Sequence, residues 1–150
     1  MEGHRLKYLL DTAVWINGVT IPEVLPPRIR RMLDHPDRKG VCSVSLLETA
    51  ILHRLGRFTL AAALEDFFVA GLSEDVHVLE LTPAIAVKTN QLPPGFQGDP
   101  FDRTIVATAA VLNLTLVTAD PAIRDTRACA VEYYPFRPAR ATRRTRMPKQ

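Results

Sequence analysis

GDPFDRTIVATAAVLNLTLVTADPAI, residues 98–123, predicts a helix that leads directly into a strand. Asp99 can cap the first turn of this helix, and Pro100 suits its first helical position. The apolar run that follows extends the helix to about Leu112, and the next residues, LTLVT, are typical of a buried strand. Asp120 follows where that strand ends. The stretch therefore predicts an α/β unit with acids at the start of its helix and beyond the end of its strand.

Outside this stretch, short apolar strands alternate with helices along the chain. Strands are expected at 7–10, 40–43, 77–81, 114–118 and 131–134. Helices are expected at 12–17, 28–34, 46–55, 60–70, 83–89 and 100–112. This alternation favours βαβ units with right-handed crossovers. We therefore expect an α/β fold with a central, mainly parallel sheet of about five strands.

The chain is long enough for one domain with a substantial core. Its 150 residues are 47% hydrophobic and 23% charged, which is typical of a globular protein. We expect residues 1–136 to form the domain. Residues 137–150 contain several arginines and no acid, so we expect a basic, flexible tail that could attract a polyanionic partner.

Several functional classes are disfavoured by the sequence. It contains no Gly-rich phosphate loop and no G-x-S-x-G motif, which argues against P-loop enzymes and serine hydrolases. No secretory pattern is evident, and the longest uncharged run, 104–119, is too short for a transmembrane helix. Cys42 and Cys129 lack metal-ligand spacing and are expected to be reduced thiols. We expect a cytoplasmic protein that does not associate with membranes.

Four acids stand where apolar runs end: Asp11, Glu48, Asp102 and Asp120. The carboxyl ends of parallel strands meet at one edge of a sheet, so these side chains can converge although they are far apart in sequence. Converged carboxylates repel one another unless a cation lies between them. Hard oxygen ligands of this kind suit Mg²⁺ or Mn²⁺.

Helix capping is the alternative explanation for each acid taken singly. Asp11 and Asp120 can cap the helices that follow their strands, and Ser45-x-x-Glu48 matches a capping box. Asp102 would also be stabilised near the positive end of a helix dipole. Capping alone is the favoured explanation for any one of these residues.

Taken together, the acids favour a shared metal site. Glu48 precedes Ile51, Leu52 and Leu55 by three, four and seven residues, so it lies on a stripe expected to face the core. A carboxylate on a buried stripe needs a partner. No Lys or Arg stands at a comparable strand end, which leaves a metal ion as the simplest partner.

Four segments carry a resemblance to a known family: YLLDTAVWI, SVSLLETAILHRLGRFTL, LTPAIAVKTNQLPP and GDPFDRTIVATAAVLNLTLVTADPAI. Together with the closing strand, they resemble the PIN-domain nucleases and, within them, the VapC toxins of toxin–antitoxin pairs. The resemblance covers about residues 8–134. DPFDR, an apolar helix and then LTLVTAD form its most specific part.

The resemblance implies a three-layer α/β/α sandwich that cuts RNA with Mg²⁺ or Mn²⁺ and is blocked by a cognate antitoxin. It implies catalytic and metal-binding roles for Asp11, Glu48, Asp102 and Asp120, with Asp99, Thr12 and Ser43 as accessory residues. A homodimer is a further expectation. The chain departs from the family pattern at Gln97, Gly98 and Leu52, where related sequences often carry basic residues. These departures bear on substrate preference rather than on activity.

In the expected mechanism, the bound ion activates a water molecule for in-line attack on a phosphodiester. Arg54, Arg57 and Arg103 are candidates for holding the RNA backbone. Two other hypotheses stay open. A Mg²⁺-dependent phosphatase or phosphoacceptor domain would also gather acids at strand ends, although the phosphatase favours a second aspartate where this chain has Ala13. A non-catalytic module could use the acidic pocket only to capture a basic partner.

Overall fold

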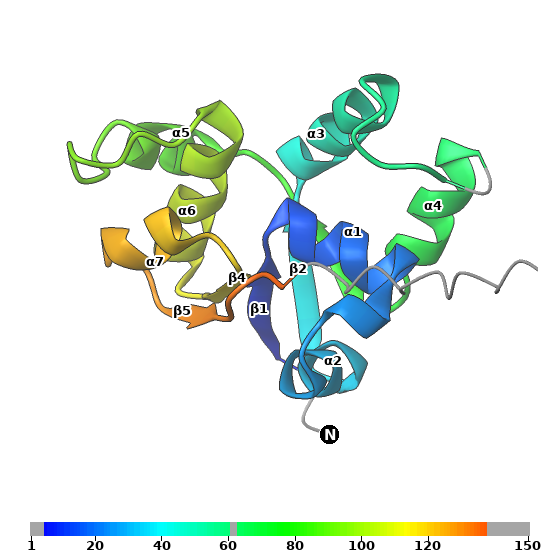
Figure 1. The fold of residues 1–150 in the computed structure, drawn as a ribbon. Coiled ribbons are helices and arrows are strands. Elements are labelled where there is room, and N and C mark those ends of the chain that lie inside the picture. Colours follow the sequence, from blue (N-terminus) through cyan, green and yellow to red (C-terminus); the bar gives the residue numbers. More distant parts are fainter. Residues whose placement is uncertain (1–4, 61–62, 138–150) are drawn as a thin grey trace, which may run out of the picture.

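A five-stranded sheet forms the centre of the computed structural model, which describes residues 5–60 and 63–137 (Figure 1). The strands run in the order β3-β2-β1-β4-β5, and every neighbouring pair is parallel. Their bounds are β1 Leu6–Leu10, β2 Arg38–Cys42, β3 Val76–Leu79, β4 Thr115–Thr118 and β5 Val131–Tyr133. The predicted parallel sheet of five strands is confirmed.

Helices cover both faces of the sheet, as the three-layer prediction requires. Their bounds are α1 Thr12–Thr20, α2 Pro27–Asp34, α3 Ser43–Arg54, α4 Leu64–Gly71, α5 Pro83–Thr89, α6 Pro100–Leu112 and α7 Pro121–Thr126, with a 3-10 turn, η1, at Pro22–Val24. Figure 1 shows α1, α2 and α4 on one side of the sheet and α5, α6 and α7 on the other.

Alternating strand residues divide the core into two clusters. Successive side chains of a strand point to opposite faces. Leu9 therefore packs with Ile105 and Val106 of α6, while Leu10 packs with Val14 and Trp15 of α1. Each cluster buries one helical layer against the sheet, and this burial is the main source of stability.

The structure corrects the prediction for α3. This helix begins at Ser43 rather than near Leu46, and its fully buried residues are Ser45 and Thr49. Of the predicted apolar stripe, Leu52 packs against the core but is only partly buried. Leu55, expected to face the core, is 57% exposed. The contact between α3 and α1 uses small hydroxyl side chains, since Thr12 of α1 bonds to the buried Ser45, and the buried Thr49 bonds within α3 to the Ser45 carbonyl.

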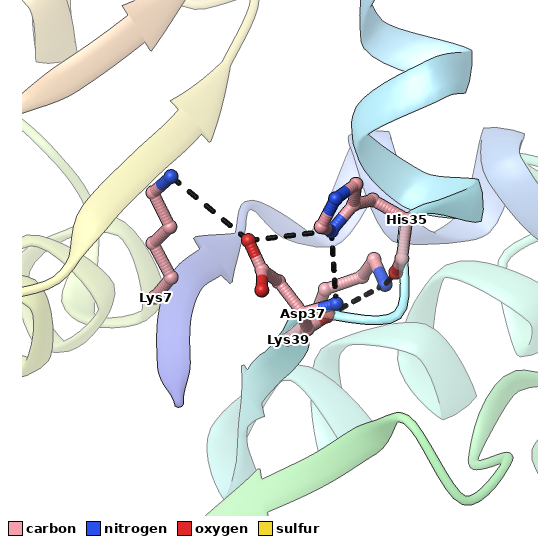
Figure 2. A network of polar contacts seen from close by, with 4 residues as sticks. All are labelled: Lys7, His35, Asp37 and Lys39. Carbon is pink, nitrogen blue, oxygen red and sulfur yellow. Dashed lines mark hydrogen bonds and ion pairs between the residues drawn. The ribbon is translucent and has the colours of Figure 1, made fainter. Parts of the chain in front are cut away.

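A buried lysine joins the end of α2 to the start of β2 (Figure 2). Lys39 is 2% exposed, and its Nζ donates to the backbone carbonyls of His35 and Asp37. Both carbonyls lie just beyond the C-terminus of α2, where a cation is favourable. Burial lowers the pKa of the Lys39 ammonium. The contact fixes the α2–β2 connection at the amino ends of the strands, which is the end of the sheet opposite the acids.

Two further expectations concern membranes and the tail. Within residues 5–60 and 63–137, no helix is both long enough and apolar enough to cross a membrane. Of the predicted tail, only Arg137 falls within the described residues, and residues 138–150 lie outside them.

The packing of α6 gives a stability prediction. Ile105 is fully buried between α6 and the sheet, so Ile105→Ala should lower the free energy of unfolding by about 2–5 kcal/mol through lost burial and a residual cavity. Urea unfolding measures this change. The matched control is Val69→Ala on α4, where the side chain is 79% exposed and the change should stay within about 0.5 kcal/mol. Equal losses in both variants would contradict the assigned core.

Candidate active site

The parallel sheet places the predicted acids at the carboxyl ends of its strands. Asp11 directly follows β1, and Asp120 follows β4, which pairs with β1. Glu48 lies on α3, which starts immediately after β2, the neighbour of β1 on its other side. Asp99 and Asp102 lie at the N-terminus of α6. All five carboxylates therefore lie on or next to helices that begin at the carboxyl end of the sheet.

Two hydrogen bonds hold the Asp11 carboxylate, which is 8% exposed. Its Oδ1 accepts from the Thr12 amide at 2.9 Å, and its Oδ2 accepts from Thr118 Oγ1 at 2.7 Å. The same Thr118 hydroxyl accepts from the Asp120 amide at 3.1 Å. Thr118 thus connects the two acids, a role that the sequence did not reveal because it depends on β1 and β4 being neighbours.

A second hydroxyl network holds Glu48. Thr12 Oγ1 lies 2.7 Å from Glu48 Oε2, to which it donates, and 2.9 Å from the buried Ser45 Oγ. Ser45 sits inside α3 and Glu48 bonds to α1, so the predicted capping box is wrong. Ser43, expected as an accessory residue, instead accepts from the Leu81 amide at 3.2 Å and ties α3 to the segment after β3.

The N-terminus of α6 presents two acids with different roles. Asp99 caps the helix, and its Oδ1 accepts from the Asp102 amide at 2.8 Å. Asp102 lies in the first helical turn. Within the described part of the chain, no group hydrogen-bonds to the Asp102 carboxylate. Both of its oxygens are therefore available to a ligand.

Burial and mutual repulsion raise the pKa values of these carboxyl groups. For Asp102 the pKa rises to about 7, first because of burial and then because of Asp99, Asp11, Glu48 and Asp120. Burial is also the largest cause of the raised pKa of Asp11 and of Glu48, and hydrogen bonds from Thr118 and Thr12 oppose it. The five carboxylates thus act on one another electrostatically and form a single site.

No cation neutralises this site from within the residues that the structure describes. Arg103, next to Asp102 in sequence, donates from Nη1 to the Phe96 carbonyl and from Nη2 to the Thr89 carbonyl. Both terminal nitrogens of this predicted RNA-binding residue therefore already have partners within the protein. Arg54 and Arg57 lie exposed at and just after the end of α3 and remain candidates for RNA contact.

The donor set fits a hard divalent cation, since every candidate ligand is a carboxylate oxygen. As the side chains stand, no three His, Cys, Asp or Glu residues of the described chain are arranged to hold a metal ion. Asp11, Glu48, Asp99 and Asp120 each direct an oxygen at a hydroxyl or amide donor. Asp11 uses both of its oxygens in hydrogen bonds and would offer a cation only their remaining lone pairs, whereas Asp102 would offer two oxygens that no group of the described chain binds.

Comparison with known proteins agrees with this architecture. The PIN domain family model matches residues 8–128. Ribonuclease VapC22 of Mycobacterium tuberculosis is 34% identical over 119 residues, which cover 79% of this chain and 91% of that protein.

Solved structures share the fold at lower identity. VapBC2 from Rickettsia felis, bound to a DNA fragment from its promoter, matches with a TM-score of 0.68 and 15% identity over 85% of this chain and 98% of that one. DNA-bound VapBC from Salmonella typhimurium matches with a TM-score of 0.65 and 24% identity over the same shares of the two chains.

The raised pKa of Asp102 predicts how stability depends on pH. In the unfolded chain this carboxyl group ionises near its ordinary value of 3.8, whereas in the folded, ion-free protein it ionises at about 7. Between these values the folded state holds the extra proton, so this group makes the protein less stable as pH rises through that window. Asp102→Asn should remove the effect and be more stable than wild type at pH 8 in chelator.

Thermal melts at pH 5 and pH 8 in EDTA test this expectation. The stability gain of Asp102→Asn should be larger at pH 8 than at pH 5. Glu65→Gln on the exposed face of α4 is the charge-matched control and should show little pH-dependent gain. A gain that does not depend on pH would contradict the electrostatic coupling.

Proposed function

Since the chain belongs to the PIN-domain family, we propose that it is a VapC-type endoribonuclease, the toxin of a toxin–antitoxin pair. The 34% identity to Ribonuclease VapC22 over most of both chains supports the activity, and the shared fold with VapBC complexes supports the pairing. We expect it to act in the cytoplasm, where RNA and an antitoxin are both available.

The observation that carries the proposal is the carboxylate of Asp102. It lies among four other carboxylates, its pKa is raised to about 7, and no hydrogen bond holds it within the described chain. Helix capping does not require this arrangement, because Asp99 already caps α6. Such an unfavourable cluster is expected where a ligand of opposite charge compensates for it.

A divalent cation, Mg²⁺ or Mn²⁺, held by Asp11, Glu48, Asp102 and Asp120 would supply an activated water and stabilise charge on the phosphodiester. The chain's own hydroxyl groups prepare this site. Thr118 orients Asp11, and Thr12 orients Glu48, so neither carboxylate is free to turn to solvent. Asp99 adds negative charge at the mouth and fixes the backbone that carries Asp102.

An antitoxin would recognise the same acidic site. Because the carboxylates lack a cation within the described chain, an arginine or lysine of the antitoxin could pair with them in place of the metal ion. Binding and catalysis are then competing uses of one site. A module that only binds a partner would show the same pairing but no cleavage, so cleavage assays separate the two functions.

Removing one acid should abolish cleavage and leave the fold intact. Asp11→Asn and Asp102→Asn should each lower the rate of RNA cleavage by about 100-fold or more in Mg²⁺ or Mn²⁺, because each loses a charge that a metal ion needs. Asn keeps the shape of the side chain, and it can still cap α1 in place of Asp11. Cleavage of a labelled oligoribonucleotide and a thermal melt are measured together.

EDTA should abolish the wild-type activity, and added Mg²⁺ or Mn²⁺ should restore it. Asp66→Asn serves as the control, because this exposed aspartate lies on α4 and is not among the acids that raise the pKa of Asp102. Undiminished cleavage in EDTA, or by Asp102→Asn, would rule out the proposed chemistry.

Expression of the wild-type chain alone should arrest growth, whereas Asp102→Asn should not, because arrest requires RNA cleavage. Coexpression with the antitoxin encoded beside it should restore growth and yield a stable complex. Growth curves and copurification measure the two effects. Arrest by both chains would show that the carboxylates are not its cause, and equal growth of all strains would argue against a toxin.

A further inference from the structure

A groove beside the acidic site plays no part in the function proposed above. It has a volume of about 420 Å³ and is lined by Pro93, Gly95, Phe96 and Gln97 of the loop before α6 and by Ala122, Asp125 and Thr126 at α7. We call it the loop–α7 groove. Both of its walls continue into the acidic site, since Gln97 stands two residues before Asp99 and Ala122 two residues after Asp120.

Arg103 fixes the loop wall of this groove. Its Nη1 donates to the Phe96 carbonyl at 3.0 Å, and its Nη2 donates to the Thr89 carbonyl at 2.7 Å. Thr89 is the last residue of α5 and Phe96 lies near the end of the loop. One side chain of α6 therefore closes the intervening segment against the helix that carries Asp102.

The ring of Phe96 anchors the same wall from inside. It is 6% exposed and belongs to the core cluster around α6, and its centroid lies 6.0 Å from the Arg103 guanidinium carbon. Gly98 makes room for the ring, because a Cβ at that position would lie only 2.3 Å from Phe96 Cζ. The backbone on both sides of Gln97 is thus held in place.

Gln97 is the exposed residue between these two fixed positions. Within residues 5–60 and 63–137, its side-chain amide takes part in no hydrogen bond. An amide presents both a donor and an acceptor. The Gln97 amide can therefore bind a ligand without first breaking a hydrogen bond to the described protein, and the backbone that carries it is already fixed.

The lining favours a nucleobase over a phosphate. No lysine or arginine lines the groove, and Asp125, although paired with Arg124 at 2.9 Å, would repel an anion. Pro93, Gly95 and Ala122 offer apolar surface against which a planar base can pack. Its volume lies in the range of about 300–1,000 Å³ that is usual for small-ligand sites. Bases of single-stranded RNA are commonly read through their edges.

We propose that the loop–α7 groove takes a base of the RNA next to the cleaved phosphodiester, that Gln97 reads the edge of this base, and that Arg103 is the positioning residue for that wall. This inference rests on the proposed ribonuclease function. The loop wall leads directly to Asp99, and the α7 wall directly follows Asp120. An RNA strand held between these two acids would therefore place the nucleotide next to the cut beside the groove.

Cleavage of an oligoribonucleotide panel, varied one base at a time around the cut, tests the proposal. Wild type should prefer one base at one flanking position. Gln97→Ala should reduce the kcat/KM ratio between the best and worst base there by about 5-fold or more, as expected for the loss of a base-edge contact. Gln91→Ala is the matched control, since Gln91 is exposed on the same loop and does not line the groove.

Arg103→Lys tests the positioning role. Lysine keeps the charge but lacks the planar fork that reaches two carbonyls at once. The variant should weaken the same base preference, whereas a loss of stability alone would lower cleavage of all substrates equally. An unchanged preference in Arg103→Lys protein would overturn the positioning role.

Binding of short single-stranded oligoribonucleotides to Asp102→Asn protein gives a readout without cleavage. Adding Gln97→Ala to this variant should remove its base preference. If wild type cuts RNA with a base preference that survives Gln97→Ala, the groove proposal fails and the ribonuclease function stands. If wild type cuts no RNA but binding shows a preference that depends on Gln97, the proposed function fails and the base site stands.

Discussion

Repulsion among carboxylates at one edge of a parallel sheet is the constraint on which the rest of the structure depends. Parallel pairing of β2, β1 and β4 brings their carboxyl ends together, and the chain places an acid on the segment after each. The pKa of Asp102, raised to about 7, reflects this crowding. Two packed helical layers supply the stability that a cluster of this kind opposes.

Hydroxyl side chains reduce the energetic cost of holding these carboxylates close together. Thr118 donates to the buried Asp11 and Thr12 donates to the half-buried Glu48, so these two carboxylates have a hydrogen-bond donor where they have no cation. Ser45 occupies a buried position on α3 where a larger apolar residue would displace Thr12. The same residues that satisfy the ion-free site therefore orient it for a ligand of positive charge.

Local patterns in the sequence predicted most of the fold. The helix predicted at 83–89 is confirmed as Pro83–Thr89. Its N-terminus is fixed by a local interaction, since the Thr82 side chain caps it by accepting from the Ile85 amide. The contacts that the sequence did not predict depend on tertiary neighbours. Thr118 matters only because β4 lies beside β1, and Arg103 is held within the protein because the carbonyls of Thr89 in α5 and Phe96 in the following loop face it. No local periodicity encodes either contact.

Carbon-13 NMR titration of the Asp102 carboxyl group tests the central claim most directly. In the ion-free protein this group should titrate at a pH of about 7, because burial and four neighbouring carboxylates disfavour its charge. Mg²⁺ should lower that pKa sharply, since a cation favours the ionised form. Titration near the ordinary value of 3.8 without an ion, or a pKa that Mg²⁺ leaves unchanged, would contradict a shared cation site.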